Sequence, residues 1–411
     1  MSYATPSTGF AYASPHEAIE TLLSRMDVVD QERVALAESA GRILSKPVHA
    51  DRDSPPSDVS AMDGYAIRSF EAVPLATLQV HGEIAIGQPA PGMPAAGCYK
   101  IGTGACVPEA CDGIIPREQV DEAQTSITLH DGLVFKPGQH IRRQGENTHK
   151  GSLITSPGTV ITPPVASALA AFGQAEVSVY RRIRVAVLTT GDELQPVASK
   201  PKPWQIRDSN MATLNNALAS VPWIETAPSR HVTDDLVSLT DALQTSAKQA
   251  DLIVTTGGVS MGDHDYLKPA LLQAGGEIIY HKLPIRPGKP SLSGVLPKAE
   301  TDHLVPIIAL PGNPVAVAVG IPLFIGPIAR KLSGISDPMP NRPSVQLIKS
   351  PSKTLHLWRY LPVRWVGNGS AELITTMGSG DLAGVALADG YAEIPPEADG
   401  TGPWVFYDAN L

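Results

Sequence analysis

Three short apolar segments constrain the fold of this chain more than any other feature. Residues 183–189, 251–255 and 305–310 are rich in Val, Ile and Leu, and segments with helical patterns lie between them. Short apolar runs predict strands buried on both faces, and their alternation with helices predicts a parallel sheet covered on both sides. The sequence therefore predicts a doubly wound α/β domain over residues 183–334, in which residues 277–281 form a further strand.

Capping residues indicate where the helices of this domain begin. Asp208, Thr233 and Asp265 each precede a helical pattern, and Asn313-Pro314 precedes a long apolar one that ends at Gly334. Side chains of these types accept hydrogen bonds from the free N–H groups of a first helical turn, and Pro suits the first position. The predicted helices are residues 208–218, 233–248, 265–273 and 313–334.

A turn rich in glycine or proline follows each apolar strand. The three turns are Thr190-Gly191-Asp192-Glu193-Leu194, residues 256–262 (Thr-Gly-Gly-Val-Ser-Met-Gly) and Pro311-Gly312-Asn313-Pro314. Parallel strands end at one edge of a sheet, where ligands bind. Glycine allows close backbone approach, and the N-termini of the following helices attract phosphate. The sequence therefore predicts a phosphate-binding pocket at this edge.

The same edge carries several carboxylates, which are Asp192, Glu193, Asp208, Asp263 and Asp265. Mg²⁺ commonly takes one or two carboxylates together with phosphate oxygens, so a divalent cation would reconcile these acids with a bound phosphate. For Asp208 and Asp265 a plain helix cap is the alternative, and Asp263 is equally consistent with a solvated turn. Glu193 lies directly after a buried strand, which favours a functional role.

A second candidate for anion binding is Arg286-Pro287-Gly288-Lys289-Pro290. Two cations in a stiff loop suit a doubly charged oxyanion or a phosphate. A solvated turn is the alternative interpretation.

The remainder of the chain predicts further domains. Short β-like runs separated by Gly, Pro and Asp predict a small β domain inserted into a helical one. These runs are residues 77–80, 98–101, 113–116, 126–129 and 132–136. The predicted domains are 1–50 plus 150–182 (split helical), 51–149 (inserted β), 183–334 (α/β) and 340–411 (C-terminal β). The split domain is expected to contain helices at 14–26, 31–39 and 162–173.

Composition excludes several classes of partner. The chain has 411 residues and a net charge of -9, so no broad basic field is present to hold nucleic acid or an anionic membrane. Three cysteines without a CxxC pattern indicate a reduced protein. The longest apolar stretch, 315–328, is too short to span a bilayer. No basic start with an apolar run is visible, so we expect a cytoplasmic protein.

Short strings spread over nearly the whole chain resemble the molybdopterin molybdenumtransferase family (the MoeA type, which includes the E domain of gephyrin). The strings occur in the family's order. They are SAMDGYA (60–66), GTGA (102–105), PREQ (116–119), IRRQGE (141–146), TTGDEL (189–194), RDSN (207–210), TTGGVSMGDHDY (255–266), RPGKP (286–290) and LPGNPV (310–315).

This resemblance implies a multi-domain α/β homodimer. Its central domain would be of the molybdopterin-adenylyltransferase type, with a split helical domain, an inserted β domain and a C-terminal β-barrel-like domain. In the dimer, the α/β pocket of one subunit would face the inserted domain of the other. The implied reaction takes adenylylated molybdopterin and molybdate with Mg²⁺, releases AMP and yields the molybdenum cofactor. A molybdopterin adenylyltransferase and apo-molybdoenzymes are the further partners implied.

The resemblance also assigns roles to individual residues. The positions matching catalytic residues are Asp63, Thr103 and Glu193. The positions matching substrate contacts are Asp208, Gly257, Gly258, Ser260, Asp265, Arg286, Lys289, Pro311 and Pro314. The metal-binding candidates are Glu193, Asp208 and Asp265.

Two departures from the family pattern keep alternatives open. Asn147 replaces the usual Asp of a Gly-Glu-Asp string, and residues 353–359 replace a Gly-Arg-x-Glu-Phe segment. Asn147 is compatible with a scaffold that has lost catalysis. An adenylyltransferase is the other alternative, but such enzymes carry Thr-Gly-Gly-Thr-Gly and lack the SAMDGYA domain.

Overall fold

The computed structural model describes residues 10–259, 265–298 and 303–411. The chain divides into two compact units. The larger unit comprises Met1–Lys46, Pro157–Ala166 and Ala175–Leu411, and the smaller comprises Pro47–Ser156 and Ser167–Gln174.

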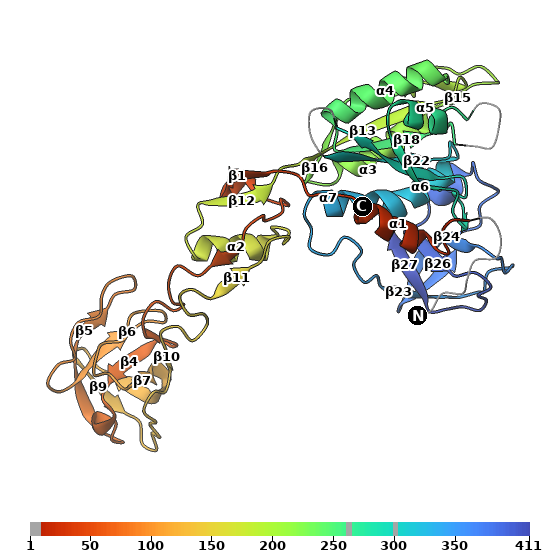
Figure 1. Ribbon diagram of the computed structural model, residues 1–411. Helices are drawn as coiled ribbons and strands as arrows, with labels where there is room; N and C mark the ends of the chain where they lie inside the picture. Colours follow the sequence, from red (N-terminus) through yellow and green to blue (C-terminus); the bar gives the residue numbers. More distant parts are fainter. Residues whose placement is uncertain (1–9, 260–264, 299–302) are drawn as a thin grey trace. The chain divides into compact units, whose positions relative to one another are not determined.

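A seven-stranded sheet forms the centre of the larger unit, in the order β16-β13-β18-β22-β21-β19 with β17 also beside β13 (Figure 1). Its strands are β13 (Ile183–Thr190), β16 (Ile224–Thr226), β17 (Arg230–Val232), β18 (Leu252–Thr256), β19 (Glu277–His281), β21 (Leu292–Pro297) and β22 (Leu304–Leu310). The three predicted apolar strands, β13, β18 and β22, are parallel neighbours, which confirms the predicted core of the sheet. The strand predicted over 277–281 is also confirmed as β19. Its antiparallel pairing with β21, and β21 itself, were not predicted.

Helices cover both faces of this sheet. Their bounds are α3 (Ser209–Ala219), α4 (Leu236–Gln249), α5 (Leu267–Gln273), α6 (Pro314–Gly320) and α7 (Gly326–Leu332). Val185 and Val187 of β13 share one buried cluster with Leu214 of α3 and with α6 and α7. Ala186 and Leu188 point to the other face, into a cluster with α4 and α5. This alternation along β13 is the doubly wound arrangement that the apolar strands predicted.

The helix caps agree with the sequence at some positions and differ at others. Asp208 caps α3 and Asn313 caps α6, as predicted. The cap of α4 is Asp235 and not Thr233, because the Asp235 carboxylate accepts the Ser238 N–H at 2.8 Å. The cap position of α5 is Tyr266, so the capping role considered for Asp265 is wrong.

The apolar segment from Pro314 to Leu332 is one continuous helical stretch, in which a π-helical turn (Ile321–Ile325) joins α6 to α7. Within the described residues it is the one helix long and apolar enough to cross a membrane, yet 83% of its apolar window is buried inside the protein. It lies against the sheet and α1 in the main core, as a core helix does.

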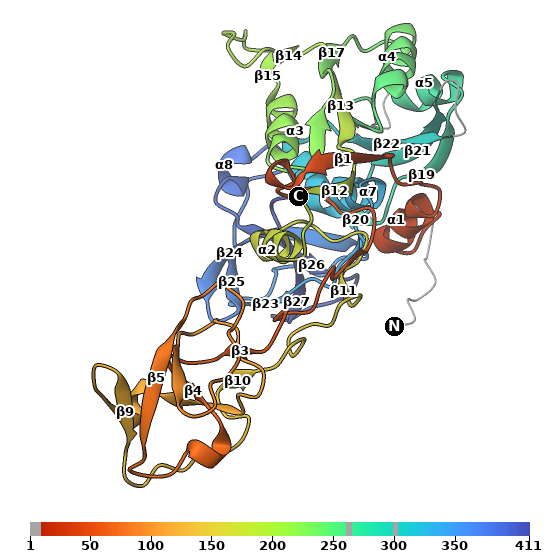
Figure 2. The ribbon, with the colours of Figure 1, turned by 90° about the vertical axis from the view of Figure 1, so that its left-hand side faces the viewer.

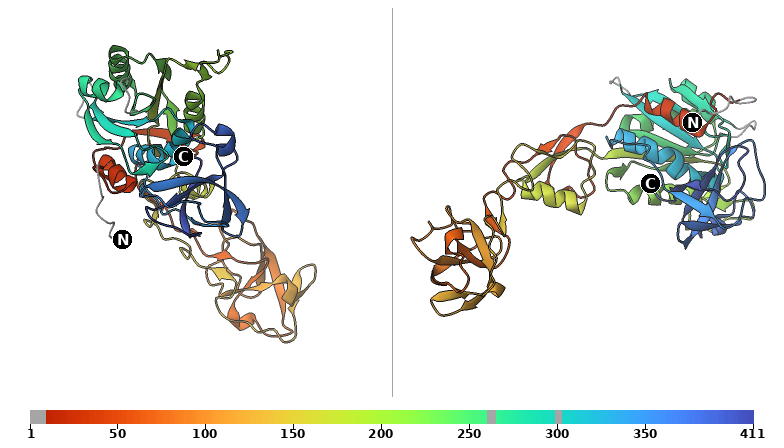
Figure 3. Two further views of the ribbon diagram at one scale, coloured as in Figure 1. Left: turned by 90° about the vertical axis from the view of Figure 1, so that its right-hand side faces the viewer. Right: turned by 90° about the horizontal axis from the view of Figure 1, so that it is seen from below.

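The C-terminal residues form a closed five-stranded barrel, which can be followed in blue in Figure 3. Its strands are β23 (Ser344–Leu347), β24 (Trp358–Gly367), β25 (Ser370–Leu373), β26 (Gly390–Ile394) and β27 (Trp404–Asp408), with the short helix α8 (Leu382–Val385) before β26. Closure comes from β24, which pairs with both β25 and β26. A sixth strand, β20 (Ile285–Arg286), pairs with β24. It thereby attaches to the barrel the loop over residues 286–290, the cationic loop, which carries Arg286 and Lys289.

The N-terminal part of the larger unit contains α1 (Pro15–Leu23), where Ser14 accepts the Glu17 N–H as predicted. The predicted helix over 31–39 is wrong. Residues Gln31–Ala35 are strand β1, paired antiparallel with β12 (Glu176–Tyr180), and only a single 3-10 turn (Leu36–Glu38) follows. Long-range pairing has overridden a weak local helical pattern here. Helix α2 (Pro163–Ala171), whose residues are divided between the two units, forms where Thr162-Pro163-Pro164 predicted it.

The smaller unit contains a six-stranded sheet in the order β7-β4-β6-β5-β9-β8 (Figure 2). These strands are β4 (Gly64–Ile67), β5 (Thr77–Ile84), β6 (Cys98–Ile101), β7 (Gly113–Pro116), β8 (Val120–Glu122) and β9 (Ser126–Leu129), and the short strands β2 (Val48–His49), β3 (Val59–Ser60), β10 (Ile141–Arg142) and β11 (Leu153–Thr155) accompany them. Four of the predicted β-like runs are strands, whereas residues 132–136 are not. The predicted domain boundaries stay predictions.

Candidate functional site

The three glycine- and proline-rich turns begin at one edge of the larger unit's sheet, which is the edge where β13, β18 and β22 end (the strand edge). Thr256 of β18 lies opposite Thr189 in β13 and Leu310 in β22, so the three strands end at the same level. Gly257 has a φ of +93°, and a Cβ there would lie 2.4 Å from the Thr190 carbonyl oxygen. Only glycine fits this position. The predicted convergence of the turns is therefore present in the fold.

Glu193 lies in the first of these turns with an exposed side chain. Its carboxylate folds back over Gly191, since a Cβ on Gly191 would lie 2.8 Å from each carboxylate oxygen. Gly191 thus provides the space that Glu193 occupies. Because the side chain is exposed at the strand edge, its carboxylate is accessible to a ligand, and its catalytic role stays a prediction.

The Asp208 carboxylate is buried and fully engaged. One oxygen accepts the Met211 N–H at 2.9 Å and so caps α3, and the other accepts the Thr189 hydroxyl at 2.6 Å. The carboxylate thereby joins the start of α3 to the end of β13. The capping interpretation of Asp208 is confirmed, while its substrate- and metal-binding roles stay predictions.

Asp265 is the carboxylate at this edge that most clearly lacks a partner. Its Oδ1 atom is buried without a hydrogen bond among the described residues. Burial raises the pKa of Asp265, and the nearby Lys268 and Lys282 oppose this shift. A buried oxygen without a donor is costly unless a ligand completes it.

A second carboxylate, Asp234, was missed by the sequence analysis. Its Oδ1 accepts the Thr190 hydroxyl at 3.1 Å and lies 3.8 Å from the position of a Cβ on Gly258. Its charge contributes to the raised pKa of Asp265, so the two carboxylates are neighbours at the edge. The adjacent pair Asp234-Asp235 was the available signal, because only one of the two can cap α4.

The cationic loop is held in place from both sides. The Lys282 N–H donates to the Ser291 carbonyl at 2.9 Å, and the Leu283 N–H donates to the Lys289 carbonyl at 3.0 Å. Arg286 and Lys289 are exposed, and the Lys289 ammonium lies 5.5 Å from the ring centroid of Phe10. The loop can therefore present two cations from a fixed backbone.

The remaining predicted substrate contacts fall around the second and third turns. Gly258 has a φ of +64°. Pro311 precedes Gly312, whose carbonyl accepts the Asn210 side-chain N–H at 2.8 Å, and Pro314 is the first residue of α6. Ser260 and Asp263 lie outside the described residues.

No group of three or more His, Cys, Asp and Glu side chains that could hold a metal ion is found in the described ranges. A pre-formed carboxylate cage is therefore not present there. The donor set fits Mg²⁺ only in the mode where one or two carboxylates bind it and phosphate oxygens supply further ligands. Asp265, whose Oδ1 lacks a donor in the part of the chain that the structure describes, and the neighbouring Asp234 fit this mode best.

The smaller unit brings together the other two predicted catalytic residues. The Thr103 N–H and hydroxyl both donate to Asp63 Oδ1, at 2.7 and 2.8 Å. These two hydrogen bonds, with a smaller contribution from the charge of Arg117, lower the pKa of Asp63. The side chains are exposed, so this surface presents a carboxylate that stays ionised to a lower pH than an ordinary aspartate.

Asn147, the departure from the family pattern, is engaged in a local network. Its Oδ1 accepts from Arg142 at 2.6 Å, and Arg142 also donates to Glu146 at 2.5 Å. The carbonyl oxygen that could replace a lost metal ligand therefore already has a donor.

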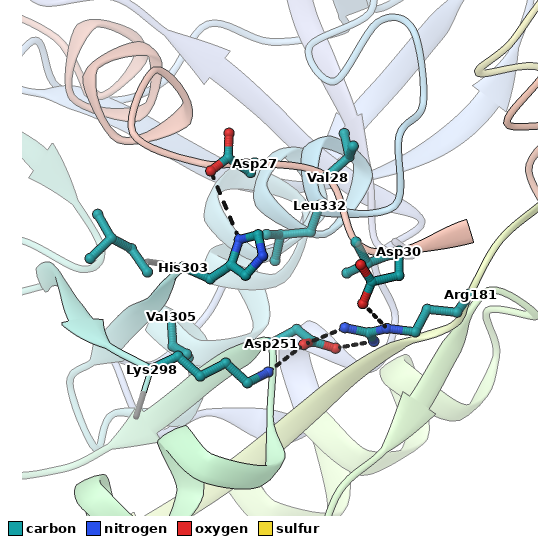
Figure 4. Close-up of a pocket in the computed structure, with 11 residues that line it drawn as sticks. Asp27, Val28, Asp30, Arg181, Asp251, Lys298, His303, Val305 and Leu332 are labelled. Carbon is teal, nitrogen blue, oxygen red and sulfur yellow. Dashed lines mark hydrogen bonds and ion pairs between the residues drawn. The ribbon is translucent and has the colours of Figure 1, made fainter. Parts of the chain in front are cut away.

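A different pocket, of about 140 Å³, lies at the opposite end of the sheet, where β18 begins (Figure 4). Its central carboxylate, Asp251, accepts from Arg181 at 2.6 and 2.9 Å and from Lys298 at 3.0 Å. The cations of this pocket are thus paired with a buried carboxylate. This arrangement is a structural ion cluster, and none of the predicted site residues lies in it.

Comparisons with known proteins agree with this architecture. Residues 13–173 match the MoeA N-terminal region (domain I and II), and residues 186–331 match a probable molybdopterin binding domain. A molybdopterin molybdenumtransferase 2 of Mycobacterium tuberculosis is 33% identical over 381 residues, covering 89% of this chain and 91% of that protein. A molybdopterin molybdenumtransferase of Haemophilus influenzae is 36% identical over 304 residues, covering 74% of this chain and 73% of that protein.

The crystal structure of a molybdopterin biosynthesis MoeA protein from Pyrococcus horikoshii superposes with a TM-score of 0.80 at 25% identity, covering 96% of this chain and 98% of that one. The fold and the strand-edge site define a protein of the MoeA class, in which a molybdopterin-binding α/β domain follows an N-terminal region with its own β sheet. The chain belongs to the molybdopterin molybdenumtransferase family.

Proposed function

We propose that this chain is a molybdenum insertase, which transfers molybdate into adenylylated molybdopterin, releases AMP and forms the molybdenum cofactor. The observation that carries the proposal is the match to molybdopterin molybdenumtransferases along most of the chain, which spans both units. Within that match, the Asp63–Thr103 hydrogen bonds and the converged turns around Gly257 provide a polar surface in each unit.

The geometry of the strand edge supports binding of an anionic substrate. Backbone N–H groups after β18 and β22 and the exposed Arg286 and Lys289 suit phosphate and molybdate, which are both oxyanions. Positioning and electrostatic stabilisation are the main catalytic tools of such a site. The exposed Glu193 carboxylate would handle protons or order the substrate.

We propose Mg²⁺ as the cofactor, held by Asp265 and Asp234 together with phosphate oxygens of the substrate. Bound there, the ion would neutralise phosphate charge and polarise the adenylyl linkage. The buried Oδ1 of Asp265, which has no donor among the described residues, supports this assignment. The Asp208 carboxylate, with both oxygens already engaged, would orient α3 beside the ion.

We also propose that the active protein is a cytoplasmic homodimer, in which the strand edge of one subunit works with Asp63 and Thr103 of the other. The support is that the predicted catalytic residues belong to two different units of the chain. A molybdopterin adenylyltransferase would supply the substrate, and apo-molybdoenzymes would accept the product.

The test is AMP release from adenylylated molybdopterin with Mg²⁺, in the presence and absence of molybdate. Wild type is expected to release AMP only when molybdate is added, and Glu193→Ala is expected to be slower by roughly 10²–10³-fold. Glu225→Ala, an exposed acid of β16 at the far end of the sheet, is the matched control and should retain activity. Wild type that binds the pterin but never releases AMP would refute the insertase and favour a scaffold.

A further inference from the structure

The N-terminal segment over residues 10–14, which leads into α1, is attached to both strands that flank the cationic loop. The Tyr12 hydroxyl donates to the carbonyl of Ile279 in β19, the strand before the loop, at 3.3 Å. The Ala13 carbonyl accepts the indole N–H of Trp358 in β24 at 3.3 Å. Because β24 pairs with β20, at the start of the loop, these two contacts place the N-terminal segment beside the loop.

Helix α1 fixes the other end of the N-terminal segment. Its residues Ala18, Ile19 and Leu22 are buried in the main core, among side chains of the sheet and of α7. His16 Nε2 lies 2.9 Å from the buried Glu393 carboxylate of β26, which also accepts two tyrosine hydroxyls of the barrel. The helix is therefore tied to the sheet and to the barrel, and the N-terminal segment starts from a fixed position.

The same segment brings an aromatic face to one cation of the loop. The Lys289 ammonium lies 5.5 Å from the centroid of the Phe10 ring, within the range of a cation–π interaction. Lys289 is exposed and Phe10 is partly buried. The ring covers one side of the ammonium, so N–H donors are left for an oxyanion on the side that faces solvent.

We propose that Phe10 is a positioning residue for the anion-binding cation Lys289, and that the N-terminal segment serves to hold its ring there. This inference rests on the proposed function, in which Lys289 binds an oxyanion, and adds to it a residue from a distant part of the sequence. A lysine side chain loses rotamer freedom when it binds an anion. An ammonium that is already held in place loses less, so the affinity of the site for molybdate is higher.

The test removes the π face and keeps the apolar volume. Phe10→Leu does this, whereas Phe10→Tyr keeps both. Phe70→Leu is the matched control, because the exposed Phe70 ring has its centroid 4.9 Å from the Arg68 guanidinium, in the smaller unit. The full-length proteins are titrated with molybdate alone by calorimetry. The KM for molybdate and kcat are measured separately from AMP release.

Phe10→Leu should bind molybdate about three- to tenfold more weakly than wild type, and its KM for molybdate should rise with kcat unchanged. Phe10→Tyr and Phe70→Leu should match wild type. When Lys289 is already replaced, in Lys289→Met, adding Phe10→Leu should cause no further loss, because the ring acts through the lysine.

Three results would overturn the proposal. They are no molybdate binding by wild type, an unchanged affinity in Phe10→Leu, and a loss in Phe10→Leu that is equally large when Lys289 is replaced by Met. Wild type that shows the dependence on Phe10 but never releases AMP would support the positioning role and refute the insertase. AMP release by wild type without any effect of Phe10→Leu would do the reverse.

Discussion

At the scale of single residues, two donors from Thr103 converge on one oxygen of Asp63. They lower the pKa of Asp63, so the carboxylate stays ionised to a lower pH than an ordinary aspartate. Removing the hydroxyl in Thr103→Val takes away one donor and raises this pKa toward its usual value. The acid limb of the pH profile for AMP release should therefore move to higher pH, because the carboxylate is protonated sooner as pH falls.

Thr103→Ser retains the hydroxyl and serves as the control, with an acid limb at the wild-type position. Superimposable acid limbs for the Val and Ser variants would mean that Asp63 does not act as a carboxylate in the reaction.

Variants of Asp208 can distinguish its structural role as the cap of α3 from a role in coordinating a metal ion. Asp208→Ala removes the cap of α3 and leaves the buried Thr189 hydroxyl without its acceptor, so the free energy of unfolding should fall by about 2 kcal/mol. Asp208→Asn keeps an acceptor for the cap and should lose about 1 kcal/mol or less. Chemical denaturation measures both values.

Because both Asp208 oxygens already have donors, the Mg²⁺ concentration for half-maximal activity should be the same in Asp208→Asn as in wild type. An increase of about tenfold in that concentration would instead support direct coordination of the metal by Asp208.

Sequence reasoning found the residues of the strand edge but not what each contacts. Glu193 was predicted from its place directly after β13 and Asp208 from its place directly before α3, yet one is exposed and the other is a buried cap. Asp234 was missed because its place at the edge depends on β17 pairing with β13, a contact across more than forty residues. The adjacent pair Asp234-Asp235 signals only that one of the two is not the cap of α4. The Asp63–Thr103 pair was assigned by resemblance alone, and its hydrogen bonds became visible only in the folded chain.

At the scale of elements, a buried carboxylate joins the beginnings of the central strands. Asp251 precedes β18 and accepts from Arg181, from Lys298 and from the Arg184 N–H at 2.9 Å. Burial by itself would raise the pKa of Asp251, but these donors outweigh it and the pKa is lowered. The cluster therefore stabilises the fold above the ordinary carboxyl range and loses that contribution as pH falls through the lowered pKa.

Asp251→Asn should reduce the free energy of unfolding by about 3 kcal/mol, the lower end for a broken buried pair, because both cations are partly exposed. The loss should shrink in acid, where wild type also loses the cluster. Asp241→Asn is the control, since Asp241 is exposed and its oxygen lies 3.9 Å from Arg230. Chemical denaturation at neutral and acidic pH measures these losses. A denaturation midpoint for Asp251→Asn equal to that of the control at neutral pH would show that the cluster contributes nothing to the stability of the fold.

The elements that sequence predicted best have strong local signals. Continuous apolar runs predicted strands β13, β18 and β22, and Asn313-Pro314 predicted the start of α6. Strands β1 and β21, which were not predicted, depend on partners elsewhere in the chain. The run Gln31–Ala35 is almost fully exposed, so no apolar periodicity indicated that it pairs with β12.

At the scale of the whole molecule, the two sets of predicted catalytic residues can be tested for action across subunits. Asp63→Asn and Glu193→Ala should each inactivate the protein alone. In a symmetric dimer whose sites combine the two units of different subunits, a mixed dimer of these variants contains one site with both changes and one with neither. Equal co-expression should then restore about a quarter of the wild-type sites, because half of the dimers are mixed and each has one intact site.

The readout is molybdate-dependent AMP release from the co-expressed pair, compared with each variant alone. Co-expression of Asp63→Asn with Asp63→Ala is the control, since both changes lie in the smaller unit and every site of a mixed dimer then lacks the Asp63 carboxylate. A site formed within a single subunit cannot be rescued, because each chain carries a change in its own site. Activity no higher than that of the separate variants, from preparations shown to contain mixed dimers, would therefore place both residue sets of a working site on the same chain.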